Sequence, residues 1–133
     1  MEKIKGGNTE THIDSITGQV IGCAIEVHRT LGPGLLESVY EKCLVYELAQ
    51  KGLTVETQKE LPVCYKDVRI DCGFRMDLLV EKIVLVEIKA VERVTAVHEA
   101  QVLTYMKLAG VKVGLLINFN EKLLKDGIKR FVL

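Results

Sequence analysis

The sequence predicts an α/β sandwich, in which helices pack on a mixed β-sheet. Three observations support this fold class. Apolar residues recur at helical spacing in two opening segments, residues 15–31 and 35–50. Strand-like segments, either alternating or continuously apolar, then occupy residues 54–89. A third helical segment, residues 95–109, precedes two further strands. This order of elements fits two or three packed layers around one sheet.

Length and composition fit one globular domain without a large net charge. The chain has 133 residues, of which 48% are hydrophobic and 27% charged, enough for one core but too few for two domains. Lys plus Arg and Asp plus Glu number 18 each, so no overall basic field attracts nucleic acid. We expect a single domain over residues 14–133, preceded by a flexible tail over residues 1–13.

Several functional classes find no motif in the chain. No apolar run approaches the roughly 20 residues that span a bilayer, and the polar first residues lack a secretory signal. We therefore expect a cytoplasmic location and no membrane partner. The four cysteines include no C-x-x-C pair, so their spacing gives zinc little support. No P-loop or dinucleotide fingerprint indicates ATP hydrolysis or hydride transfer.

Both opening helices should turn an apolar face toward the sheet. The first is expected to begin at Ser15, with Asp14 or Ser15 as its N-cap, and to end at the break Leu31–Gly34. The second should begin near Leu35 and stop at Gly52. Its inward residues are expected to be Leu36, Val39, Tyr40, Cys43, Leu44 and Leu48.

The middle of the chain predicts two successive pairs of strands. Residues 54–65 alternate in strand fashion, and Lys66 with Asp67 forms the expected turn into a short strand at Val68–Ile70. Residues 74–80 and 83–89 should form the second, antiparallel pair.

The last third of the chain should complete the sheet. The third helix is expected to start at Thr95 and to close at Gly110. A buried strand at residues 111–118 and an edge strand at residues 127–133 should follow it.

The register of the second pair decides where its charged residues lie. A two-residue turn would set every polar residue opposite an apolar one. A three-residue or five-residue connection instead makes one face wholly apolar, so we favour it. Asp77 then lies opposite Glu87, and Arg75 lies opposite Lys89, on the other face.

Two neighbouring carboxylates in this position predict a metal ion. Asp77 and Glu87 would repel each other, and the adjacent Leu79 and Leu85 would desolvate them. A hard divalent cation, Mg²⁺ or Mn²⁺, would relieve both costs and activate a bound water toward a phosphate ester. Lys89, on the same face, could orient that water or stabilise negative charge. The alternative is an ion-paired cluster, with Lys89 and Arg75 neutralising the acids.

The pattern D-x(9)-E-x-K resembles the PD-(D/E)XK nuclease superfamily, with Met76 in place of the usual proline. "GLLESVY", containing Gly34, Glu37 and Tyr40, resembles the signature of the GxxExxY protein family, a branch of that superfamily. "GFRMDLLV", "VEIKAVE" and "VHEAQVLTYMKLAG" resemble it too, and the similarity covers residues 14–133. The resemblance implies a restriction-endonuclease-like sandwich, with a mixed β-sheet and helices on both faces.

The resemblance also implies further site residues. Glu37 would be another metal ligand beside Asp77 and Glu87, although an acid near a helix N-terminus is also favoured by the dipole. Gln101 and Tyr105 share a helix face and would support the catalytic lysine and contact the nucleic-acid strand. Alternatively, Tyr105 is a core aromatic and Gln101 a buried amide. Three more residues could bind substrate or support the site: Tyr40, His98 and Arg75.

The function expected from the resemblance is hydrolysis of phosphodiester bonds in DNA or RNA with Mg²⁺ or Mn²⁺. The absence of net charge predicts weak nucleic-acid binding by the chain alone, so a homodimer or a protein partner could supply the binding surface. One alternative is a catalytically silent module that binds nucleic acid or protein on the same fold. Another is a phosphoesterase acting on small nucleotides.

Overall fold

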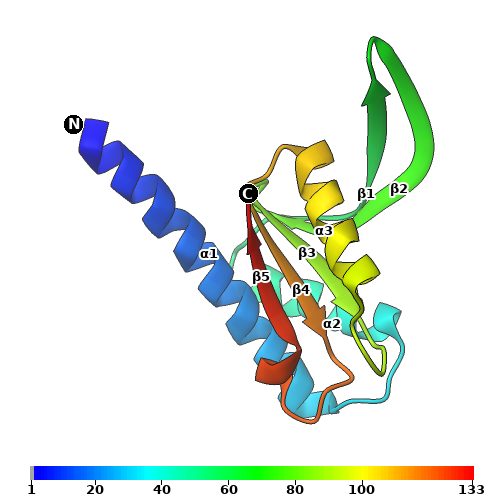
Figure 1. Cartoon of the computed structure of the whole chain (residues 1–133). Helices are drawn as coiled ribbons and strands as arrows, with labels where there is room; N and C mark the ends of the chain where they lie inside the picture. The colour runs from blue at the N-terminus through cyan, green and yellow to red at the C-terminus, as the bar shows by residue number, and fades with distance from the viewer. Residues whose placement is uncertain (1) are drawn as a thin grey trace.

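The computed structural model describes residues 2–133, with side chains described from Glu10 onward. Three helices and five strands follow in the order α1 (Glu2–Leu31), α2 (Glu37–Gln50), β1 (Val55–Tyr65), β2 (Val68–Val80), β3 (Val84–Lys89), α3 (Ala96–Ala109), β4 (Val113–Asn118) and, after a short 3₁₀ turn, β5 (Ile128–Val132). The strands form one sheet in the order β1-β2-β3-β4-β5 (Figure 1). The β3–β4 pair is parallel and the other pairs are antiparallel, so the sheet is mixed.

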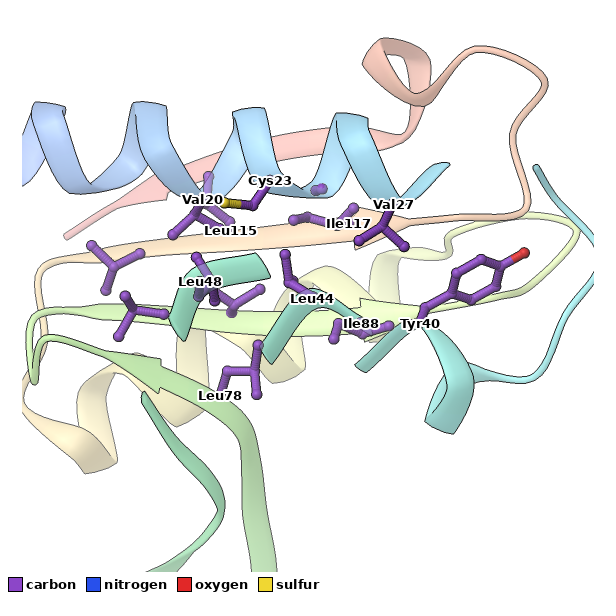
Figure 2. Close-up of a cluster of buried hydrophobic side chains, with 14 of the residues drawn as sticks. Val20, Cys23, Val27, Tyr40, Leu44, Leu48, Leu78, Ile88, Leu115 and Ile117 are labelled. Carbon is purple, nitrogen blue, oxygen red and sulfur yellow. The ribbon is translucent and has the colours of Figure 1, made fainter. Parts of the chain in front are cut away.

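Helices cover both faces of this sheet, as expected. On one face, Leu78, Ile88 and Ile117 pack against buried side chains of α1 and α2 (Figure 2). On the other face, Leu79 and Leu85 pack with α3 in a second buried cluster. Continuous burial along β3 and β4 follows from this two-sided cover. No helix in the described part of the chain is long and apolar enough to cross a membrane.

The expected start of the first helix is wrong. Helix α1 begins at Glu2, so Asp14 and Ser15 lie inside it and neither is its N-cap. No proline precedes Ser15 to stop the helix, and an interior glycine costs only about 1 kcal/mol relative to alanine. Asp14 forms an ion pair with Arg130 of β5 at 3.0 Å. The flexibility of residues 1–13 stays a prediction.

Helix α2 buries fewer residues than expected. Tyr40, Leu44 and Leu48 are fully buried, and their spacing of four places them along one helix face. Leu36 is the N-cap and is 74% exposed, while Val39 is 37% exposed. Both lie off the face that meets the sheet, so the prediction that they point inward is wrong.

Strand β2 is longer than expected, because the segment Val68–Ile70 and residues 74–80 belong to one continuous strand. This strand pairs with β1. A register shift between Leu61 and Val63 marks a bulge, beyond which the pair leaves the body of the sheet (Figure 1). All residues from 64 to 75 are exposed. We call residues 64–75 the ribbon.

The register predicted for β2 and β3 is confirmed. Leu78 pairs with Val86, and Val80 pairs with Val84, so three residues connect the strands. Glu81 and Lys82 in this connection both have positive φ, as a tight hairpin turn with the right twist requires. Helix α3 also begins and ends as predicted, with Thr95 as its N-cap and Gly110 as its C-cap.

Candidate active site

The two acids that the sequence singles out meet where β2 and β3 stop pairing. The backbone ladder between these strands covers Leu78–Val80 and Val84–Val86 only. Next to it, the carboxylates of Asp77 and Glu87 replace backbone partners. The Asp77 N–H donates to Glu87 Oε2 at 2.8 Å, and the Ile88 N–H donates to Asp77 Oδ2 at 2.8 Å. Each carboxylate is therefore fixed by the backbone of the opposite strand.

Burial makes the charge of Glu87 expensive. This residue is 4% exposed in the sheet, and Asp77 beside it is half-buried. Burial first, and the charge of Asp77 second, raise the pKa of Glu87 to about 8, against the opposing effects of the Asp77 N–H and of Lys89. Lys89 ends β3 and is half-buried. A positive charge placed between the two acids would restore the ionised form of Glu87.

The acids fit a hard divalent ion. Asp77 accepts one hydrogen bond on each oxygen, from Gln58 and from Ile88, which leaves lone pairs for a further ligand contact. Among the described residues, no group of three His, Cys, Asp or Glu side chains is arranged to hold a metal ion. Mg²⁺ commonly binds proteins through one or two carboxylates and retains several waters. Asp77 and Glu87 meet that requirement.

Helix α2 brings two more acids toward this pair. Glu37 is exposed in the first turn of α2, and its charge contributes to the raised pKa of Glu87. The structure thus places Glu37 near the pair but outside a three-ligand cluster. Glu41, one turn further, is half-buried, and its pKa is raised by burial and by Asp77.

Glu41 and Gln58 are the residues that the sequence analysis missed. The Gln58 Nε2 donates to Glu41 Oε1 at 2.8 Å and to Asp77 Oδ1 at 3.2 Å, and so joins α2 to β2. The spacing of four between Glu37 and Glu41 was a signal for Glu41, because it places both on one helix face. No sequence feature indicated Gln58.

Helix α3 borders the acids on the face of the sheet that carries Leu79 and Leu85. Gln101 donates to the hydroxyl of Tyr105 at 3.1 Å, as their shared helix face allows. Tyr105 is 7% exposed, and its pKa is raised by burial and by the charges of Glu87 and Asp77. Gln101 and Tyr105 therefore belong to the surroundings of the two acids.

Tyr40 makes its contacts at the turn between α1 and α2. Its hydroxyl donates to the Gly32 carbonyl at 2.6 Å and accepts from the Leu35 N–H at 3.1 Å. Its ring stacks on Phe119 with centroids 4.5 Å apart (its position beside Leu44 is visible in Figure 2). These contacts give Tyr40 a role in closing the turn.

His98 and Arg75 also have partners other than the acids. The His98 Nδ1 accepts from the Thr95 N–H at 3.0 Å and completes the capping box of α3. Arg75 pairs with Glu60 of β1 at 3.6 Å. The expected opposition of Arg75 to Lys89 is not formed, because the β2–β3 ladder ends before either residue.

Comparison with known proteins gives one match. A family model described as the PD-(D/E)XK nuclease superfamily matches residues 14–131, which is most of the chain and contains every residue of the site. No curated protein and no solved structure matches.

Proposed function

The chain belongs to the PD-(D/E)XK nuclease superfamily, and we propose that it is a metal-dependent nuclease that hydrolyses phosphodiester bonds of DNA or RNA. One observation carries the proposal: a buried glutamate, Glu87, shares its site with Asp77 at the divergence of two strands, and Lys89 follows on the same strand. Desolvated carboxylates of this kind are costly unless a cation joins them.

The proposed roles follow from the placement of each group. Asp77 and Glu87 hold Mg²⁺ or Mn²⁺, with Glu37 as a further acid from α2. The chemistry that a bound divalent ion would supply here is polarisation of a phosphoryl oxygen and a lower pKa of the attacking water. Lys89 orients that water or stabilises developing negative charge. Gln101 and Tyr105 support this end of the site from α3.

The finer assignments are part of the same proposal. We assign the chain to the GxxExxY branch, on the strength of Gly34, Glu37 and Tyr40. We propose a cytoplasmic location and weak intrinsic binding of nucleic acid, in keeping with 18 basic against 18 acidic residues. A homodimer or a protein partner would then contribute the remaining binding surface.

Cleavage assays with site variants test the proposal. DNA, RNA and small nucleotide esters should be incubated with Mg²⁺, with Mn²⁺ and with a chelator. We expect Glu87→Ala and Lys89→Ala each to abolish metal-dependent cleavage of a polynucleotide, while Lys107→Ala, an exposed change on α3, retains it. Equal cleavage by wild type and both site variants would refute the nuclease. Cleavage of small esters alone would identify a nucleotide phosphoesterase instead.

A further inference from the structure

Gln58 has a backbone conformation that its position in the sheet does not explain. It lies in β1 between two regular pairs, Thr57 with Leu78 and Lys59 with Met76, and the register is the same on both sides of it. Its φ is +49°, in the left-handed region that L residues other than Asn and Asp rarely adopt. A residue inserted as a bulge would have shifted the register, and none is shifted here.

The other residues with this conformation have an ordinary reason for it. The structure describes four non-glycine residues with positive φ. Lys66 lies in the turn between β1 and β2, and Glu81 and Lys82 lie in the turn between β2 and β3. Tight hairpin turns favour positive φ. Gln58 lies within a strand, where the left-handed conformation has a cost and no turn to form.

The unusual backbone conformation directs the side-chain amide of Gln58 toward two carboxylates. Gln58 is exposed, so core packing does not hold its side chain. Its Nε2 donates to Glu41 Oε1 at 2.8 Å and to Asp77 Oδ1 at 3.2 Å. An amide NH₂ has two hydrogens, so this pair of acceptors uses its full donor capacity. Local strain that persists in this way commonly marks a functional constraint.

The Asp77 carboxylate is therefore held by hydrogen bonds from two neighbouring strands. Oδ1 accepts from Gln58 on β1, and Oδ2 accepts from the Ile88 N–H on β3. Rotation of the Asp77 carboxylate would break at least one of these two hydrogen bonds. Carboxylate ligands of metal ions are usually oriented by such outer hydrogen bonds, and losing one typically weakens metal binding or activity.

We propose that Gln58 is a positioning residue: its side-chain amide orients the Asp77 carboxylate for a divalent cation and ties it to Glu41 of α2. This inference rests on the proposed metal-dependent function and adds a residue outside the D…E-x-K motif. The strained backbone at Gln58 is the conformation in which that amide reaches both acids.

Gln58→Gly tests the proposal, because glycine adopts positive φ without strain but carries no amide. Gln58→Asn is a second variant, since asparagine tolerates this region but has a shorter side chain. Lys66→Gly is the matched control: it relieves the same backbone conformation in the turn at the tip of the β1–β2 hairpin. Binding of Mn²⁺ to each metal-free variant should be measured by calorimetry, and the midpoint of thermal unfolding by circular dichroism.

We expect Gln58→Gly to weaken Mn²⁺ binding by about 10-fold to 100-fold, with an unfolding midpoint equal to or above that of the wild type. Gln58→Asn should weaken binding in the same direction, and Lys66→Gly should leave it unchanged. A residue with a purely structural role would give the opposite sign for stability, because its loss would lower the midpoint.

Three results would overturn the proposal, and they differ from one another. Unchanged Mn²⁺ affinity in Gln58→Gly would remove the positioning role while leaving the metal site intact. Weaker binding accompanied by a lowered midpoint in both Gln58 variants would make the residue structural. An Mn²⁺ affinity that is the same in the wild type, in Asp77→Asn and in Glu87→Gln would refute the metal site itself, and the positioning role with it.

Discussion

Replacing Glu87 by glutamine should stabilise the metal-free protein at neutral pH. Glu87 is 4% exposed, and its Oε2 accepts a hydrogen bond from the Asp77 N–H. Glutamine has nearly the same shape, and its amide oxygen can accept the same bond. The substitution therefore supplies a side chain that is neutral without taking up a proton on folding, and it opens no cavity. The same change should abolish metal-dependent cleavage, because it removes a proposed ligand.

The expected size follows from the pKa of Glu87, which is about 8 in the folded chain against an ordinary value of 4.5. The folded state keeps a proton that the unfolded chain releases, so this stabilisation is complete below pH 4.5 and is lost as the pH rises through 8. Each pH unit between those values costs about 1.4 kcal/mol for one group. From about pH 5 to pH 7 the wild type should lose about 2–3 kcal/mol through Glu87.

Urea unfolding of both proteins, with a chelator and at several pH values from about 5 to 8, measures this difference. The wild type should become less stable as the pH rises, and Glu87→Gln should show a much smaller slope. A residual slope of the same sign is expected from Glu41, whose pKa is also raised by burial. Saturating Mn²⁺ should reduce the wild-type slope, because it favours the ionised carboxylate. Parallel pH profiles for the two proteins without metal would refute the argument.

Two further predictions separate structural residues from the site. Tyr40→Phe should lower the free energy of unfolding by about 1–3 kcal/mol, because it leaves the Gly32 carbonyl and the Leu35 N–H without their partner; urea unfolding measures this, and Mn²⁺ affinity should be unchanged. Gly127→Ala should lower the free energy of unfolding by about 1–3 kcal/mol or more, because the added methyl would overlap the carbonyl oxygen of Asn118. A thermal unfolding midpoint equal to that of the wild type would show that this turn can shift.

Local patterns in the sequence predicted most of the sheet. The alternation around Leu78 and Val86 has one register that gives an apolar face, and that register is observed. Thr95 and Gly110 likewise marked the ends of α3 through short-range cap chemistry. Such features depend on a few neighbouring residues, so a single sequence contains the information they need.

The features that escaped prediction depend on distant contacts. Gln58 reaches Glu41 and Asp77 across 17 and 19 residues, and nothing near it in the chain indicates those partners. The exposure of Leu36 follows from where α2 meets the sheet, which its own apolar character does not reveal. The assignment of His98 needed the observed cap, since a histidine near a helix start has several uses.

The ribbon divides the chain into parts under different constraints. Its residues, 64–75, are exposed throughout, whereas Met76 and the strand that follows it enter the buried clusters at once. Changes of sequence or length at the tip therefore disturb few packed atoms. Phe74 at its base lies 5.9 Å from the ring of Tyr105, centroid to centroid, so the ribbon begins beside a residue that the charges of Glu87 and Asp77 reach. The ribbon is thus a surface next to the proposed site whose sequence can change while the packed scaffold stays the same.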